Sequence, residues 1–195
     1  MIKVGPYGGT NPSSVRSPFG GNSTFGSNSV FGSPFGGNSD CSSKAWDEKG
    51  VKGLSRIYIC HGYGVINSIQ TGYVEGNSIV LSEKHGGNGS RFDTVTLDYP
   101  SEFLTGINGH TTSSGIGSIT FVTNQSTYGP FGSEKYNPAA GVFGSVKPGE
   151  MYVITFGNDF FGFHGYSNDS FLEKIGAYVK PSLTTCVGIK SEPTV

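Results

Sequence analysis

Short apolar runs, rich in valine, isoleucine and phenylalanine, recur along most of the chain and are separated by turn residues. In one run Val95 and Leu97 alternate with polar residues, so both side chains can point into a core while their neighbours face water. Ile119 and Phe121 repeat this arrangement around Thr120. A period of two residues is typical of a strand with one buried face, so the pattern predicts β-structure.

The spacing of these runs predicts an all-β domain. Turn chemistry recurs roughly every 8–12 residues, which is typical of a sandwich, a barrel or a prism. The helix-like stretch 170–174 is too short for a stable helix, and a strand near residues 2–4 should complete the core. The expected strands are 54–60, 65–74, 79–82, 92–98, 103–107, 116–123, 151–156, 160–163 and 175–179, and the expected turns are 86–89, 108–109, 129–130, 147–149 and 157–159.

Composition and charge narrow the function classes. The 15 valines and 12 isoleucines outnumber the 6 leucines and 4 alanines, and β-branched side chains suit pleated sheets better than helices. The net charge is −1, from 13 basic and 14 acidic side chains, so no summed positive field attracts phosphate backbones or anionic lipids. No run of 18 apolar residues occurs. We therefore expect neither a nucleic-acid partner nor a membrane partner.

One stretch differs from the rest of the chain. Between residues 10 and 45, 23 of 36 positions are Ser, Gly, Asn or Pro. The heptapeptide Ser-Pro-Phe-Gly-Gly-Asn-Ser occurs twice within it, at 17–23 and at 33–39. Such a composition does not bury a core of its own. We interpret the stretch as an insertion in a single domain of residues 1–182, which is followed by a C-terminal tail of residues 183–195.

The placement of cysteine and histidine argues against a metal site and against catalysis. The four histidines stand more than twenty residues apart, without the spacing of zinc ligands. Cys60 precedes His61, but adjacent residues on a strand point to opposite faces. We expect isolated polar histidines, no metal, no cofactor and no enzymatic activity.

Cysteine usage also bears on the compartment. Cys41, Cys60 and Cys186 form an odd, scattered set that suits free thiols in a reducing environment. The N-terminal residues lack the apolar core of a secretion signal. These observations predict a cytoplasmic or nucleocytoplasmic location.

Three glycine-rich turns have chemistry suited to a neutral polyol: Gly8-Gly9, Gly86-Gly87 and residues 165–173. A sugar presents vicinal hydroxyls that donate to a carboxylate and accept from backbone N–H groups. Glycine lets the backbone come close enough to supply those N–H groups. Such a site needs no cofactor.

Several segments then follow one another in an order that resembles a known family. They are Lys3-Val-Gly-Pro-Tyr-Gly-Gly9, Ala45-Trp-Asp-Glu-Lys-Gly50, Glu83-Lys-His-Gly-Gly87, Leu97-Asp-Tyr-Pro-Ser-Glu-Phe-Leu-Thr-Gly-Ile-Asn-Gly-His110, Thr123-Asn-Gln-Ser-Thr-Tyr-Gly-Pro-Phe-Gly132, and Phe163-His-Gly165 followed by Leu172-Glu-Lys-Ile-Gly-Ala-Tyr-Val-Lys-Pro181. Apart from residues 10–45, the chain resembles the plant jacalin-related lectins of the mannose type. The resemblance implies a β-prism I fold, in which three four-stranded sheets pack about a pseudo-threefold axis and loops at one end bind sugar.

The resemblance also implies the site residues, which are Gly8, Gly9, Asp169, Ser170, Phe171 and Glu173. The chain departs from the family pattern there, because Asp169 stands where glycine is expected, Glu173 replaces the shorter aspartate, and the loop holds one extra residue. The insertion ends in another glycine pair, Gly36 and Gly37, which is the alternative first loop. Gly86 and Gly87 are candidates for a second sugar site.

Two functions follow from the resemblance. The first is a lectin without catalytic activity that binds mannose- or glucose-containing glycans, as a homodimer because single shallow sites bind weakly. The alternative is a β-prism protein-interaction module that has lost or altered sugar binding and docks through the Phe-Gly insertion.

Overall fold

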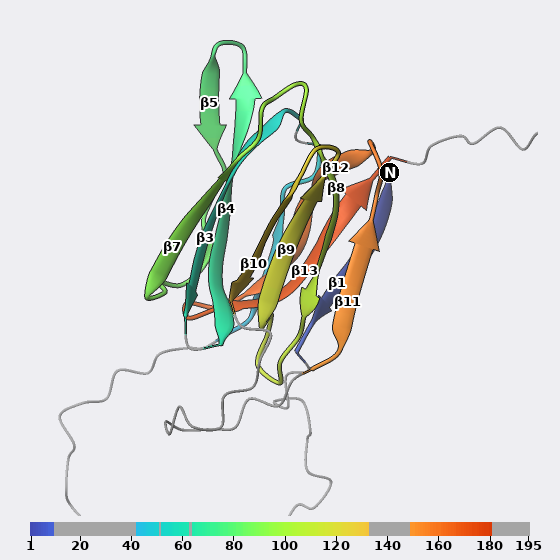
Figure 1. The fold of residues 1–195 in the computed structure, drawn as a ribbon. Coiled ribbons are helices and arrows are strands. Elements are labelled where there is room, and N and C mark those ends of the chain that lie inside the picture. Colours follow the sequence, from blue (N-terminus) through green and yellow to red (C-terminus); the bar gives the residue numbers. More distant parts are fainter. Residues whose placement is uncertain (10–41, 51, 63, 133–148, 181–195) are drawn as a thin grey trace, which may run out of the picture.

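The computed structural model describes residues 1–9, 42–50, 52–62, 64–132 and 149–180, and all regular secondary structure in these ranges is β (Figure 1). The predicted all-β class is thereby confirmed. No helix in these ranges is long and apolar enough to cross a membrane. The strands are β1 (Ile2–Gly8), β2 (Lys44–Asp47), β3 (Leu54–Gly62), β4 (Val65–Glu75), β5 (Ser78–Leu81), β6 (His85–Gly86), β7 (Arg91–Thr96), β8 (Leu104–His110), β9 (Ser118–Thr123), β10 (Thr127–Gly132), β11 (Met151–Thr155), β12 (Phe160–Ser167) and β13 (Leu172–Val179).

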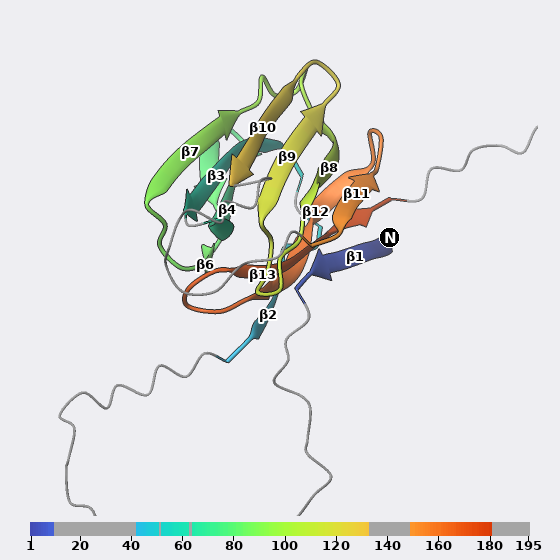
Figure 2. The same ribbon diagram turned by 60° about the horizontal axis from the view of Figure 1, so that its bottom comes forward.

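The strands form three antiparallel sheets that share one core, as a β-prism requires (Figures 1 and 2). The first sheet has the order β1-β13-β12-β2, so the first and last strands pair, with Ile2 opposite Val179. The second has the order β10-β9-β8-β11, and the third β5-β4-β3-β7. The third sheet also holds the two-residue strand β6 beside β4, so it exceeds the four strands predicted.

Isoleucine supplies most of the largest fully buried side chains of the core. Burying each such side chain stabilises the fold by roughly 1.5–3 kcal/mol. The rings of Phe121 on β9 and Phe163 on β12 meet edge to face, with centroids 6.4 Å apart, and so join two of the sheets. The largest fully buried side chains are Phe121, Phe163, Ile57, Ile59, Ile66, Ile69, Ile107, Ile116, Ile119, Ile154, Leu172 and Ile175.

The predicted alternation is correct for one strand and partly wrong for another. Val95 and Leu97 are buried between exposed polar neighbours, as expected. Ile119 and Phe121 are also buried, but Thr120 between them is buried as well. Strand β9 lies in the middle of its sheet, between β10 and β8, and is buried along nearly its whole length.

Two predicted turns are strand segments. Residues 108–109 lie within β8, where a Cβ on Gly109 would be 2.0 Å from the carbonyl oxygen of Ser118, so this glycine permits a close approach of β8 to β9. Residues 129–130 form a bulge in β10, and an edge strand tolerates a proline that donates no ladder hydrogen bond. The turn at residues 157–159 is confirmed.

Strands β2, β6 and β10 were not predicted, because their residues carry no alternating apolar pattern and pair only in the folded chain. Other predictions fall outside the described residues: most of the insertion (10–45) with Gly36 and Gly37, Cys41 and Cys186, residues 147 and 148 of one expected turn, and the tail 183–195.

Candidate functional site

Three segments meet at one end of the prism, where β1 ends, β8 runs into β9, and β12 turns into β13 (lower end in Figure 1). Gly8 pairs with Lys174 on β13. A Cβ on Gly9 would lie 2.7 Å from the nitrogen of Gly115, and a Cβ on Gly115 would lie 2.4 Å from the carbonyl oxygen of Leu172. The structure therefore brings the predicted first loop to the predicted second loop. The loop between β8 and β9, which contains Gly115, packs between them, and the sequence did not indicate it.

The second loop is a tighter turn than the predicted span 165–173. Strand β12 continues to Ser167 and β13 begins at Leu172. Within the turn, Oδ1 of Asn168 accepts hydrogen bonds from the backbone nitrogens of Ser170 at 2.8 Å and Phe171 at 3.0 Å. The backbone amides of these two predicted site residues thus donate to Asn168, which closes the turn as an Asx motif.

The two predicted carboxylates differ sharply in environment. Asp169 is a surface residue with 80% of its side chain exposed, and its Oδ1 lies 3.5 Å from Nζ of Lys44. Glu173 is only 5% exposed. Its Oε1 accepts a hydrogen bond from Nδ2 of Asn168 at 2.9 Å, and its Oε2 accepts one from Oγ of Ser43.

Glu173 is unusual because its charge meets no cation among the described residues. Buried charges are normally paired with an opposite charge. A carboxylate held only by neutral hydroxyl and amide donors has the chemistry of a site for a neutral hydroxylated ligand. Glu173 is therefore the candidate binding group at this end of the prism.

The predicted second site lies directly against the same turn. A Cβ on Gly87 would be 2.3 Å from the carbonyl oxygen of Asp169. Asn67 on β4 links the two loops. Its side-chain Nδ2 donates to the main-chain carbonyl oxygen of Ser170 at 3.0 Å, and its main-chain carbonyl oxygen accepts a hydrogen bond from the main-chain nitrogen of Gly87 at 3.0 Å. The Gly86-Gly87 loop therefore lies next to the turn between β12 and β13, which precedes Glu173.

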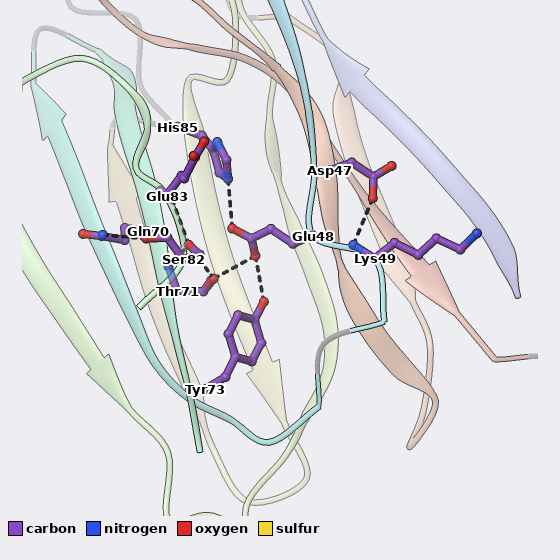
Figure 3. Close-up of polar contacts among 9 residues, drawn as sticks. All are labelled: Asp47, Glu48, Lys49, Gln70, Thr71, Tyr73, Ser82, Glu83 and His85. Carbon is purple, nitrogen blue, oxygen red and sulfur yellow. Dashed lines mark hydrogen bonds and ion pairs between the residues drawn. The ribbon is translucent and has the colours of Figure 1, made fainter. Parts of the chain in front are cut away.

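A buried polar cluster centred on Glu48 lies at the base of the Gly86-Gly87 loop (Figure 3). Glu48 follows β2, and Nε2 of His85 on β6 lies 2.9 Å from its Oε1. Its Oε2 accepts hydrogen bonds from the hydroxyls of Thr71 and Tyr73 on β4, each at 2.7 Å. Because His85 immediately precedes Gly86-Gly87, the cluster holds the base of that loop.

The cluster also shifts the titration of its members. Burial alone would raise the pKa of Glu48, but hydrogen bonds from His85, Tyr73, Thr71 and Ser82 outweigh burial and hold its pKa below the ordinary value. Burial and the Glu48 charge raise the pKa of Tyr73. The carboxylate therefore stays ionised and the phenol protonated at neutral pH.

Trp46 completes the cluster from the other side. Its ring is stacked on the ring of His85, with centroids 4.1 Å apart and planes 8° from parallel. Trp46 is on β2 and His85 on β6, so the stack joins the first sheet to the third. Both residues lie in segments that carried the family resemblance, but their pairing joins distant parts of the sequence and could not be deduced from it.

The prediction of isolated histidines is wrong for two of the four. His85 pairs with Glu48, and Nε2 of His61 lies 2.7 Å from Oδ2 of Asp93. Each histidine and its carboxylate come from separate strands or loops, so their sequence spacing showed no cluster. In the described part of the chain no group of three or more potential metal ligands occurs, and Cys60 is a half-buried free thiol.

The fold and the site define a β-prism protein whose glycine loop and acidic loop meet at one end. The chain belongs to the jacalin family: the model of the jacalin-like lectin domain matches residues 32–178. Protein RESTRICTED TEV MOVEMENT 1 of Arabidopsis thaliana is 36% identical over 143 residues, which cover 70% of this chain and 77% of that protein. Jacalin-related lectin 2 of the same plant is 33% identical over 154 residues, covering 75% of this chain and 82% of that one.

Solved structures agree on the fold. The mannose-binding lectin from champedak superposes with a TM-score of 0.62 at 23% identity and covers 92% of this chain and 97% of its own. Artocarpin in a complex with mannotriose superposes with a TM-score of 0.61 at 22% identity, with the same two coverages. The predicted β-prism I architecture is therefore confirmed.

Proposed function

We propose that this protein is a lectin without catalytic activity that binds mannose- or glucose-containing glycans at the loops around Glu173. The observation that carries the proposal is the buried carboxylate whose described partners are the neutral groups of Asn168 and Ser43. Support also comes from membership of the jacalin family, and from structural neighbours described as mannose-binding or as a mannotriose complex.

Glu173 can accept hydrogen bonds from the hydroxyls of a neutral sugar without help from a metal. Each hydrogen bond from a hydroxyl to a carboxylate is stronger than a neutral one, contributing about 1.5–3 kcal/mol. The amides of Ser170 and Phe171 are occupied by Asn168, so the complementary donors must come from a neighbouring segment. The Gly8-Gly9 end of β1 is next to β13 and is the candidate for that role.

Replacing Glu173 by glutamine is expected to weaken the binding of methyl α-mannoside at least about tenfold, because the amide keeps the shape but loses the charge that strengthens the hydrogen bonds. The affinity can be measured by an NMR titration, which reaches millimolar constants. Asp169→Asn is the control, because the Asp169 side chain is largely exposed and pairs with Lys44 at the surface. It should change the affinity less than about twofold. Loss of binding in Asp169→Asn with normal binding in Glu173→Gln would contradict the proposed site.

We further propose that the lectin is a homodimer, because a single shallow site binding near the millimolar range contributes only about 4 kcal/mol and avidity requires a second site. An exposed apolar strip offers the surface for it. Ile2 on β1 and Met151 and Val153 on β11 are exposed, and both strands are unpaired edges of their sheets. The two edges lie side by side in both views (Figures 1 and 2). The ring of Tyr7 on β1 stacks on the ring of Tyr152 on β11.

Val153→Glu is expected to convert the dimer to a monomer, because it places a charge in the middle of the strip. Size-exclusion chromatography with light scattering gives the mass. The matched control is Val80→Glu, another exposed valine on an edge strand, β5, of a different sheet. A mass that stays dimeric in Val153→Glu and falls in Val80→Glu would place the interface on the third sheet instead.

The second candidate function is a β-prism module for protein partners, with the Phe-Gly insertion as its docking element. It is favoured by the internal hydrogen bonds that already occupy Glu173 and the Ser170 and Phe171 amides. A wild-type protein that is folded by circular dichroism and silent on a glycan array and in the mannoside titration would support this second function over the first.

A further inference from the structure

Ser43 is the last residue before β2, and its hydroxyl donates to Oε2 of Glu173 across a separation of 130 residues in the chain. Ser43 is exposed, whereas the other described partner of Glu173, Asn168, is buried. Asn168 is also fixed by its own turn, because its Oδ1 accepts two backbone hydrogen bonds. Of the two donors to this carboxylate among the described residues, Ser43 is the one that faces solvent and can be exchanged.

The contact has the chemistry of the proposed ligand. A serine hydroxyl that donates to a carboxylate makes the same hydrogen bond that a sugar hydroxyl makes. Glu173 has little exposed surface of its own, and the exposed Ser43 is the described residue that donates to its Oε2. A sugar hydroxyl that approaches Oε2 from solvent therefore meets the Ser43 hydroxyl, and the two compete for the solvent-facing side of this acceptor.

The backbone at this point is positioned by neighbouring contacts and need not move. Lys44 pairs in register with Ser167 at the end of β12, and Nζ of Lys44 lies 3.5 Å from Oδ1 of Asp169 across the turn. These contacts keep Ser43 beside Glu173. Rotation about the χ1 angle of Ser43 alone would release the carboxylate, since a serine side chain has three staggered positions of similar energy.

We propose that Ser43 is a built-in competitor of the glycan: its hydroxyl occupies the carboxylate oxygen of Glu173 that a saccharide hydroxyl must take, and so it sets the affinity of the site. The inference rests on the proposed lectin function. It assigns to Ser43 the role of an affinity- and specificity-determining residue, with a neutral saccharide hydroxyl as the group that displaces it. The site then binds only ligands whose hydroxyl forms a hydrogen bond to Glu173 that is at least as strong as the one from Ser43.

The test compares Ser43→Ala with Ser43→Thr in the full chain. The alanine variant removes the competitor and is expected to bind methyl α-mannoside about tenfold more tightly, since a hydrogen bond to a charged group no longer has to be exchanged. The threonine variant keeps the hydroxyl and should bind like the wild type. The affinities are measured by NMR titration, and the Cβ signal of Ser43 in the wild type should shift as the sugar saturates the site.

Each outcome has a distinct meaning. An affinity of Ser43→Ala equal to the wild type, or weaker than it, with the wild type binding mannoside, overturns the competitor role and leaves the lectin function standing. Binding by Ser43→Ala alone, with a silent wild type, supports the competitor in its strongest form. Silence in both folded proteins overturns the lectin function, and the competitor role with it. Glu173→Gln combined with Ser43→Ala is the control, because without the carboxylate the gain should disappear.

Discussion

Glu48→Gln is expected to lower the free energy of unfolding by about 1–3 kcal/mol for each buried donor that loses its charged acceptor. The physical reason is that His85 loses its carboxylate while remaining buried beneath Trp46. The hydroxyls of Thr71 and Tyr73 also lose a charged acceptor and keep at most a neutral one. Chemical denaturation at neutral pH, followed by far-UV circular dichroism, measures the loss.

The same substitution should also change the response to acid. The pKa of Glu48 is held below its ordinary value of 4.5 in the folded protein, so its contribution to stability is complete above that value and is lost as the pH falls through the lower, folded pKa. The wild type should therefore lose stability below about pH 4.5 more steeply than Glu48→Gln. The stability of the variant should still fall with pH, though less steeply. Burial would raise the pKa values of Asp47 and Glu102, but hydrogen bonds to these carboxyls outweigh burial and hold both pKa values low.

Glu83→Gln is the matched control for this experiment. Glu83 is exposed and lies next to the cluster in Figure 3, but its side chain does not enter the hydrogen bonds drawn there. Its replacement should change stability by less than about 0.5 kcal/mol, as for most surface substitutions. Equal stability of the two variants would show that the Glu48 cluster does not hold the fold together.

Gly165→Ala is expected to cost about 3 kcal/mol or more and to weaken glycan binding as well. A Cβ at this position would lie 2.0 Å from the carbonyl oxygen of Lys174 and 2.9 Å from Cζ2 of Trp46. The first overlap is with backbone on the paired strand β13, which cannot move without breaking the ladder next to Glu173. The second would push Trp46 away from His85.

The measurements are thermal unfolding and the mannoside titration. Gly76→Asn serves as the control, because a Cβ at Gly76 meets no atom within 4 Å and asparagine tolerates its positive φ of 60°. The control should unfold within about 1 kcal/mol of the wild type and bind normally. A Gly165→Ala protein as stable as this control would mean that β12 and β13 can separate at this point without cost.

Much of the fold could be predicted because strand formation leaves a local trace. The alternation of Val95 and Leu97 with polar residues survives in the folded β7 and in the segment that follows it. Glycine was less informative, since it has two uses. At residues 157–159 it marks a turn, whereas Gly109 lies within a strand and is small so that a neighbouring backbone can approach.

The site was predicted only in outline. The family resemblance selected the Gly8-Gly9 and Asp169–Glu173 segments, and the structure brings them to one end of the prism. The resemblance did not distinguish the exposed Asp169 from the buried Glu173, because exposure depends on what packs over each side chain. Asn168 was missed although it sits in the predicted loop, since only the folded turn shows which amides its side chain accepts.

The all-β class could be read from the sequence, because side-chain periodicity is a property of neighbouring residues. The β-prism was an expectation from the resemblance of ordered segments to the jacalin-related lectins. Which donors surround the acidic groups became visible only in the folded chain. Ser43 reaches Glu173 from 130 residues away, and His85 reaches Glu48 from 37 residues away. Such pairs are made by strands from different parts of the chain that the hydrophobic core brings together, and no local pattern encodes which hydroxyl or ring will face which carboxylate.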